Sequence, residues 1–121
     1  MRPIIRDITI EHEPLESFRP VDARDFAVSL TILIGPESQP GEELFYLSIC
    51  TAEWLRNQCE KHGYFFTGRR LVMDHWDFDL IKQFLDKRIS TLVAESWEDL
   101  ATMITRIAYW EFEDYREAPA K

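Results

Sequence analysis

Two stretches of strict alternation between apolar and polar positions predict the centre of a β-sheet. Every second residue is apolar across residues 26–34, and residues 44–50 repeat the pattern after a loop rich in Gly and Pro. Because side chains of a strand point alternately to its two faces, each stretch has one face suited to a core. We expect a hairpin of two strands here. Residues 4–12 predict a further strand, interrupted early by Arg6, and the charged, proline-containing residues 13–25 predict an irregular surface connection.

Apolar residues at helical spacing predict three helices. Residues 52–62 follow Thr51, which suits an N-cap, and precede Gly63, which suits a helix end. A second helix is expected to begin near Asp77 and a third at Ser96. Between the first two helices, the apolar centre at residues 71–73 predicts another short strand. The apolar positions that define the second and third helices are Phe78, Ile81, Leu85, Ile89, Trp97, Leu100, Ala101, Ile104, Ile107 and Ala108.

The segment that follows the third helix is open to two interpretations. A strand would place Trp110, Phe112 and Asp114 on one side and Glu111, Glu113 and Tyr115 on the other. Because no Gly or Pro separates this segment from the third helix, a continued helix is the alternative. In both cases we expect the two aromatic residues at 110 and 112 to anchor the segment and the glutamates to project outward, with residues 116–121 as a frayed tail.

Together these elements predict a single α+β domain over residues 1–121, with a mainly antiparallel sheet of four or five strands and about three helices packed on one face. Cys50 and Cys59 match neither a C-x-x-C pair nor a disulfide framework, so free thiols in a reducing compartment are expected. The charged start lacks the apolar region of a signal peptide, and no apolar run approaches membrane-spanning length. We therefore expect a soluble, cytoplasmic protein that does not contact a membrane.

The balance of acidic and basic side chains bears on which class of partner the protein binds. The chain has 14 basic and 22 acidic side chains and a formal net charge of −8. Direct nucleic-acid binding is a poor fit, because it needs a basic surface and the counterion release that accompanies phosphate contacts. A basic protein partner fits better, although moderate negative charge also serves solubility alone.

One short stretch resembles a catalytic or metal-binding cluster. Asp74, His75, Asp77 and Asp79 lie within six residues, and carboxylates with a histidine can ligate a metal ion. However, Asp77 and Asp79 stand where helix capping and the helix dipole favour acids, and the sequence identifies no further ligands. We prefer the structural interpretation and keep a small metal-dependent enzyme as the alternative. The chain has no P-loop, G-x-G-x-x-G, G-x-S-x-G or H-E-x-x-H motif, so we expect a protein without enzymatic activity or cofactor.

Four motifs, taken in order over about residues 24–116, resemble the immunity protein 8 family. They are "LTILIGP" at residues 30–36, "ELFYLSICTAEWL" at 43–55, "SWEDL" at 96–100 and "YWEFEDY" at 109–115. The positions that carry the family motif, and that we interpret as structural, are Phe45, Trp54, Leu55, Trp97, Trp110, Phe112 and Tyr115.

The resemblance implies a cytoplasmic antidote from bacterial polymorphic toxin and contact-dependent inhibition systems. Such a protein binds and neutralises a cognate toxin C-terminal domain, usually encoded by the adjacent gene. A nuclease with a basic active-site cleft is our leading interpretation of that toxin, because acidic residues opposite a basic cleft accelerate association. The expected toxin-facing acids are Asp77, Asp79, Glu111, Glu113 and Asp114. A generic interaction domain, without a toxin gene nearby, is a second alternative, and the oligomeric state is open because exposed aromatic residues also suit a homodimer interface.

Overall fold

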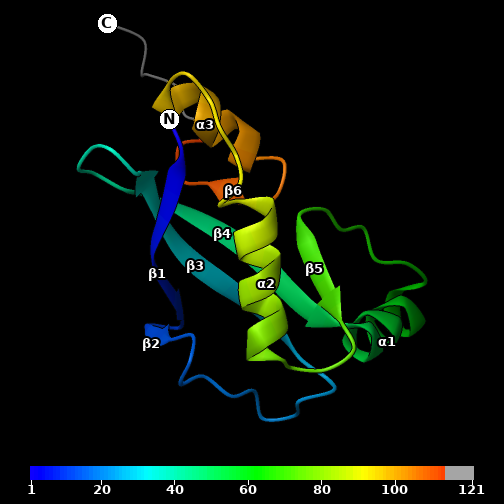
Figure 1. Ribbon diagram of the computed structural model, residues 1–121. Helices are drawn as coiled ribbons and strands as arrows, with labels where there is room; N and C mark the ends of the chain where they lie inside the picture. The colour runs from blue at the N-terminus through cyan, green and yellow to red at the C-terminus, as the bar shows by residue number, and fades with distance from the viewer. Residues whose placement is uncertain (114–121) are drawn as a thin grey trace, which may run out of the picture.

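A long hairpin forms the middle of the sheet (Figure 1). The computed structural model describes residues 1–113, in which β3 (Ala27–Pro36) and β4 (Glu43–Thr51) pair antiparallel, with Leu30 opposite Leu47. The apolar residues of the alternating pattern face one side of both strands and are fully buried at their centres. The predicted hairpin is therefore confirmed.

The strand at the N-terminus contains an irregularity at the predicted position. β1 (Pro3–Ile10) pairs antiparallel with β3, and its register shifts between Ile5 and Asp7. The extra residue is Arg6, whose guanidinium donates to the carbonyl of Pro36 at 3.0 Å. A β-bulge of this kind bends the strand and re-aims the side chains on either side of it.

The connection after β1 is more ordered than the sequence suggests. Glu13–Pro14 forms a short strand, β2, that pairs with β1, and Leu15 directly after it is almost completely buried. The prediction of an irregular surface connection over residues 13–25 is therefore wrong at its start. The prolines and acidic residues of this stretch gave no indication that Leu15 is buried in the core and that Phe18 packs against it.

Two different segments pair with the second edge of β4. β5 (Arg70–Met73) runs parallel to the last residues of β4, after a crossover through α1 (Ala52–His62). β6 (Tyr109–Trp110) runs antiparallel to the first residues of β4, and Trp110 lies opposite Phe45. The segment after the third helix is therefore not a continued helix: Tyr109–Trp110 is a short strand and residues 111–113 form a turn. Within residues 1–113 the sheet has six strands, in the order β2-β1-β3-β4-β5 with β6 on β4, instead of the expected four or five.

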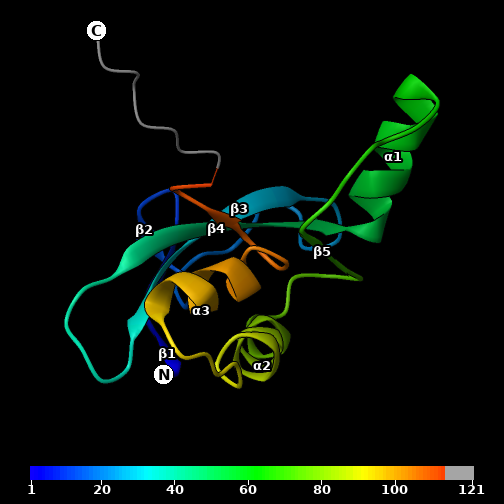
Figure 2. The same ribbon diagram turned by 90° about the horizontal axis from the view of Figure 1, so that it is seen from above.

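Two helices cover one face of this sheet. Figure 2 shows α2 (Phe78–Arg88) and α3 (Trp97–Ile104) on the same side of the strands. The core fills the space between them and the sheet, and its residues include Ile8, Ile10, Leu30, Ile32, Ile34, Phe45, Leu47, Ile49, Ile81, Leu85, Leu100, Ile104 and Ile107. The α+β class and the mainly antiparallel sheet are confirmed. No helix within residues 1–113 is long and apolar enough to cross a bilayer.

The first helix differs from the other two. α1 follows β4 without a loop, lies on the opposite side of the sheet at one end (Figure 2), and has no fully buried residue. The expectation that all helices pack on one face is therefore wrong for α1. Its sequence, AEWLRNQCEKH, is mostly polar and lacks the continuous apolar stripe that a core-facing helix buries.

Short-range sequence signals correctly predict the first residues of the helices and the end of α1. Thr51, Asp77 and Ser96 are the N-caps of α1, α2 and α3, as predicted, and Gly63 ends α1 with a positive φ of 84°. α3 is shorter than its apolar pattern, because the helix ends at Ile104 and the later apolar residues are buried in the following turn.

Candidate binding surface

An aromatic cluster fixes the C-terminal strand to the sheet. The Trp110 ring stacks on buried Phe45 with 6.3 Å between ring centroids, and Trp97 from α3 meets Phe45 edge-on at the same distance. The Trp97 indole N–H donates to the carboxylate of Glu43. Phe112 packs edge-on against Trp110 but is 42% exposed. Trp110 is thus the anchor that the sequence predicts, and Phe112 is only partly covered.

A second cluster joins α1 to the sheet. Trp54 meets Phe65 edge-on at 5.2 Å, and the guanidinium of Arg70 lies 5.3 Å from the Trp54 ring. Leu55 on the same helix is half-buried. Cation–π contacts of this kind hold a long arginine side chain in one position. Tyr115, the last residue of the family motif, lies outside the described residues.

Most of the acids expected to face a partner also have local structural roles. The Asp77 carboxylate accepts the N–H of Leu80 at 3.1 Å and caps α2. The Glu111 carboxylate accepts the N–H of Leu44 at 3.0 Å beside β6. Asp79 is exposed in the first turn of α2. Asp114 lies outside the described residues.

Glu113 faces a basic side chain of the protein itself. Its carboxylate forms an ion pair with Arg69, and its side chain is only 22% exposed. The guanidinium of Arg69 also lies 4.2 Å from the centre of the Tyr109 ring. The expectation that Glu113 projects outward is therefore wrong, because a partner 44 positions away in the chain holds it inward.

The structure does not bring the four described acids into one cluster. Asp77 and Asp79 lie at the start of α2, whereas Glu111 and Glu113 follow β6 near the opposite end of the sheet (Figure 1). An interface of standard area that covers one pair of acids is therefore expected to leave the other pair at the margin of the interface or outside it.

The candidate metal cluster is organised by ion pairs. The Asp74 carboxylate lies 3.2 Å from the guanidinium of Arg24 and 3.0 Å from Nδ1 of His75. The hydrogen bond with His75, followed by the charge of Arg24, holds the pKa of Asp74 below its ordinary value. Within residues 1–113 no group of three or more His, Cys, Asp or Glu side chains is arranged to hold a metal ion. The described residues thus give the metal-dependent alternative no support.

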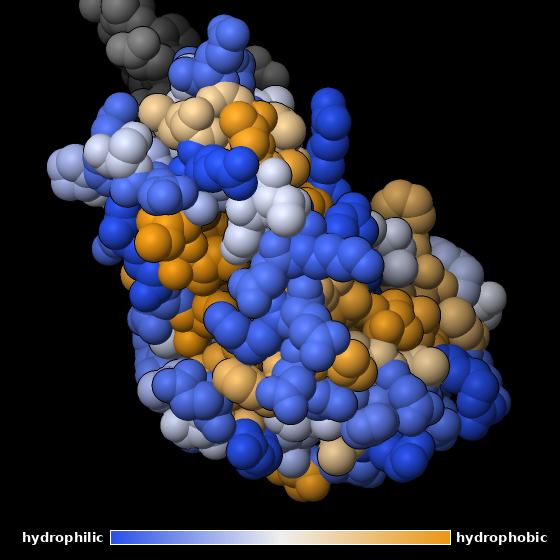
Figure 3. Space-filling model, in the orientation of Figure 1, coloured by the Kyte–Doolittle hydropathy of each residue, from blue (hydrophilic) through white to orange (hydrophobic). Residues whose placement is uncertain are grey.

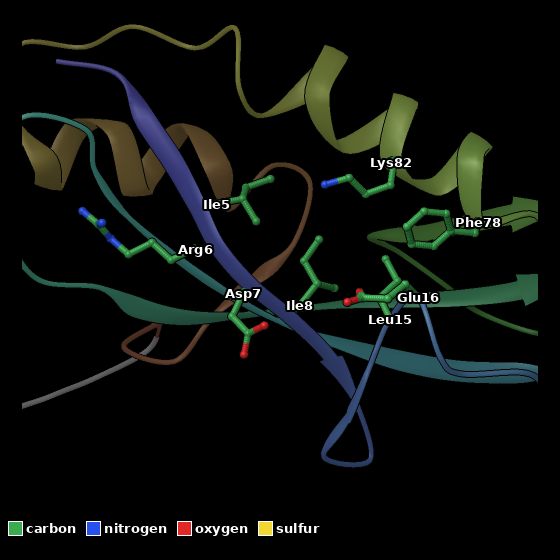
Figure 4. Close-up of a pocket in the computed structure, with 8 residues that line it drawn as sticks. All are labelled: Ile5, Arg6, Asp7, Ile8, Leu15, Glu16, Phe78 and Lys82. Carbon is green, nitrogen blue, oxygen red and sulfur yellow. The ribbon is translucent and has the colours of Figure 1, made fainter.

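A cavity between β1 and α2 has no catalytic arrangement either. It has a volume of about 190 Å³ and is lined by Ile5, Ile8, Leu15 and Phe78 together with charged side chains. In Figure 4, Lys82 and Phe78 extend from α2 toward β1, whereas Arg6 and Asp7 point away from that helix. Among the described residues, the lining includes no Ser, Cys or His that could serve as a nucleophile or its base.

Among the residues that the structure describes, α1 is the only helix on the face of the sheet opposite α2 and α3, and it lies at one end (Figure 2). Strand pairing and alternation give this face a mixture of hydroxyl, aliphatic and aromatic side chains: Ser29, Thr31, Leu33, Leu44, Tyr46, Ser48 and Tyr109. Most of them are half-buried, and Tyr109 is 43% exposed. We call these seven residues the uncovered sheet face. Tyrosine with small polar groups is typical of protein interfaces rather than of cores.

The loop between α1 and β5 extends this surface with exposed aromatic rings. Tyr64 is 72% exposed and Phe66 is 93% exposed. Full burial of a phenylalanine is worth about 1.5–3 kcal/mol, so an exposed one is costly unless a partner covers it. Neither residue was among the expected site residues, because the only feature identified between the first two helices was the apolar centre at residues 71–73. By contrast, the side of the molecule that carries α2 shows apolar residues in separate patches between hydrophilic ones (Figure 3).

A comparison with protein families identifies the chain. The model of the family described as immunity protein 8 matches residues 4–115, nearly the whole length. No curated protein and no solved structure matches the chain. The matched range contains the aromatic cluster around Phe45, α1 with its loop, and the uncovered sheet face. The chain therefore belongs to the immunity protein 8 family.

Proposed function

We propose that this immunity protein binds a cognate toxin domain directly and neutralises it without catalysis. The observation that carries the proposal is the family match over residues 4–115, which includes every element of the described fold. Direct contact is the simplest mechanism for such a protein, because a surface that blocks a toxin needs no reactive groups of its own.

The proposed contact surface is the uncovered sheet face together with the loop aromatics. Protein interfaces often have large aromatic residues at their centres, where the partner excludes water. Truncation of such a hot-spot residue to alanine costs about 2 kcal/mol or more of binding free energy. Tyr109, Tyr64 and Phe66 are exposed enough to fill such positions. Their burial by a partner would remove apolar surface from water at little ordering cost, because each ring has few rotatable bonds.

The net charge of −8 supports a toxin with a basic surface, and a nuclease is the class we propose. Negative charge facing a basic cleft raises the association rate and disfavours wrong partners. Glu111 directly follows β6 and is exposed beside Leu44, at the margin of the proposed surface. Asp114 lies outside the described residues and stays in the proposed set, whereas Glu113 leaves it because Arg69 holds its carboxylate inward. Asp77 and Asp79 at the start of α2 would contribute long-range attraction.

Co-expression tests the proposal. Bacteria that produce the toxin domain encoded next to this gene should stop growing, and production of this chain should restore growth. A matched control is the same chain with Tyr109→Asp and Phe66→Asp, which places charge at the centre of the proposed interface. We expect loss of protection from the control. Failure of the unaltered chain to restore growth, together with failure to bind that toxin, would falsify the proposal.

A further inference from the structure

Four arginines line one cavity on the helix-covered side of the gap between β5 and β6. They are Arg69 and Arg70 at the start of β5, Arg88 at the end of α2, and Arg106 in the turn after α3. Figure 1 shows these three places side by side. The cavity has a volume of about 220 Å³, and its remaining lining is apolar: Leu47, Leu71, Phe84 and Ile107. We call it the arginine pocket.

This concentration of positive charge stands out against the rest of the protein. Four of the 14 basic residues of a chain with net charge −8 line the pocket, and none of its lining residues within 1–113 is acidic. Among residues 1–113, Arg69 is the only one of the four in an ion pair with a carboxylate, so the other charges repel one another and an anion placed among them is favoured. The arrangement is therefore unfavourable for the protein alone and favourable for a complex with an acidic group.

The four arginines differ in the contacts that their guanidinium groups already make within the protein. Arg69 forms an ion pair with Glu113, and Arg70 donates to the Thr67 hydroxyl at 2.8 Å. The guanidinium of Arg88 lies 5.7 Å from the Phe84 ring, and neither Arg88 nor Arg106 forms an ion pair with another of the residues 1–113. Both are exposed. These two guanidiniums are the ones whose charge is left for a ligand.

The backbone also holds the rim of the pocket in a specific shape. Arg69 has a φ of 50°, in the left-handed region that residues with a Cβ rarely adopt. Such conformations persist where the surrounding contacts fix them, and they are frequent at binding sites. Here the contacts of the Arg69 guanidinium with Glu113 and Tyr109 provide that fixation. The pocket is therefore preorganised at one side.

The size and lining of the pocket define the ligand. A volume of about 220 Å³ is below the range of roughly 300–1,000 Å³ typical of cofactor and substrate sites, and fits one or two side chains instead. The guanidinium fork matches a carboxylate through two parallel hydrogen bonds, and the apolar floor matches an aliphatic or aromatic neighbour. We propose that the arginine pocket receives an acidic segment of the cognate toxin domain, with a carboxylate on Arg88 and Arg106 and an adjacent apolar side chain on the floor.

This inference rests on the proposed function and adds the orientation of the complex. Arg69, which lines the pocket, lies 4.2 Å from the centre of the Tyr109 ring, so it connects the pocket with a residue of the uncovered sheet face. A toxin that places a basic cleft near the acids of this chain and an acidic segment in the pocket can dock in one orientation only. Opposite charges at two separate points of an interface fix its register in this way.

A peptide titration tests the pocket without the toxin. A fluorescent peptide of alternating Glu and Leu should bind the wild-type chain saturably at physiological salt, whereas a Lys–Leu peptide of equal length should not. The repulsion from the net negative charge is then largely screened, because the Debye length is about 8 Å at physiological ionic strength. We expect Arg88→Gln with Arg106→Gln to weaken binding at least tenfold. Arg24→Gln, which removes one positive charge outside the pocket from an exposed pair with Asp74, should leave it unchanged.

Two comparisons keep the result interpretable. The double variant with Arg88→Lys and Arg106→Lys keeps the charge but loses the planar fork, so its affinity should lie between those of the wild type and the Gln variant. Thermal unfolding of each variant checks that the exposed substitutions leave the fold intact. Absence of saturable binding to the wild type, or equal binding by the Arg88/Arg106 and Arg24 Gln variants, overturns the proposal.

A second experiment measures the affinity of the same variants for the toxin domain itself. We expect the Arg88→Gln, Arg106→Gln variant to bind the toxin at least tenfold more weakly than the Arg24→Gln variant. If the wild type binds the toxin and the double variant binds equally well, the pocket inference fails and the immunity function stands. If the wild type does not bind the toxin at all, both fail.

Discussion

At the scale of single residues, Thr51 shows how one hydroxyl can join distant parts of the chain. It is completely buried, and its oxygen accepts the N–H of Trp54 at 3.3 Å and the N–H of Phe26 at 3.2 Å. The first bond caps α1, which the sequence predicts. The second fixes the start of β3, and no local pattern could predict it because the two residues are 25 positions apart.

Removal of this hydroxyl should be costly. We expect Thr51→Ala to lower the free energy of unfolding by about 3 kcal/mol, since loss of an N-cap costs about 1 kcal/mol and a buried N–H without a partner costs about 1–3 kcal/mol. Thr51→Ser keeps the oxygen and should cost less than half as much. Urea denaturation of the three proteins measures both values. Equal stability of the alanine and serine variants would show that the hydroxyl has no such role.

Trp110 permits a second prediction at this scale. It is half-buried on Phe45, and its indole N–H has no hydrogen-bond partner among residues 1–113. We therefore expect Trp110→Ala to cost about 3 kcal/mol of unfolding free energy, at the lower end of the range of about 3–5 kcal/mol for buried aromatic truncations. Tyr64→Ala, at an exposed loop position, should change stability by less than about 0.5 kcal/mol. A similar loss from both variants in chemical denaturation would contradict the anchoring role of Trp110.

At the scale of secondary-structure elements, the parts that could be predicted are those that local physics determines. Alternation predicts β3 and β4, and capping residues predict the helix starts, because both depend on neighbours within a few positions. The side of the sheet on which α1 lies and the pairing of β6 with β4 depend on residues far apart in the sequence. The same holds for the site, where the Arg69–Glu113 ion pair and the arginine pocket arise from contacts between distant segments.

The position of α1 predicts unequal stability among the helices. α1 has no fully buried residue, whereas α2 buries Ile81 and Leu85 against the sheet. Helices draw most of their stability from such packing. Hydrogen exchange followed by nuclear magnetic resonance should therefore show faster exchange for the interior amides of α1 than for those of α2. Equal protection in the two helices would mean that α1 is held by contacts as strong as those of the core.

At the scale of the whole molecule, the two faces of the sheet differ in what covers them. α2 and α3 close the core on one face, and the other face presents tyrosines, hydroxyl groups and a loop with exposed aromatic rings. The charge is also unevenly distributed, because an acidic protein gathers four arginines at one strand edge. A partner surface must match both features at once, which is the basis of specificity in such complexes.

The separation of the acids makes the location of the partner testable. We expect Glu111→Lys to slow association with the toxin domain about tenfold at low salt and to reduce the salt dependence of the rate. Charge reversal at Asp79 should have a smaller effect, and Asp86→Lys on α2 is the matched control for net charge. Stopped-flow measurements at several salt concentrations give these rates. A larger effect of Asp79→Lys than of Glu111→Lys would place the toxin at the start of α2.

The central claim is that this member of the immunity protein 8 family acts by direct binding to its toxin. Calorimetric titration of the purified, catalytically inactivated toxin domain into this protein tests that claim most directly. Protection of the producing cell requires tight binding, so we predict a one-to-one complex with a dissociation constant of about 1 nM or lower, equivalent to roughly −12 kcal/mol. Absence of a complex at micromolar concentrations, with a toxin that this protein nevertheless renders harmless in cells, would contradict it.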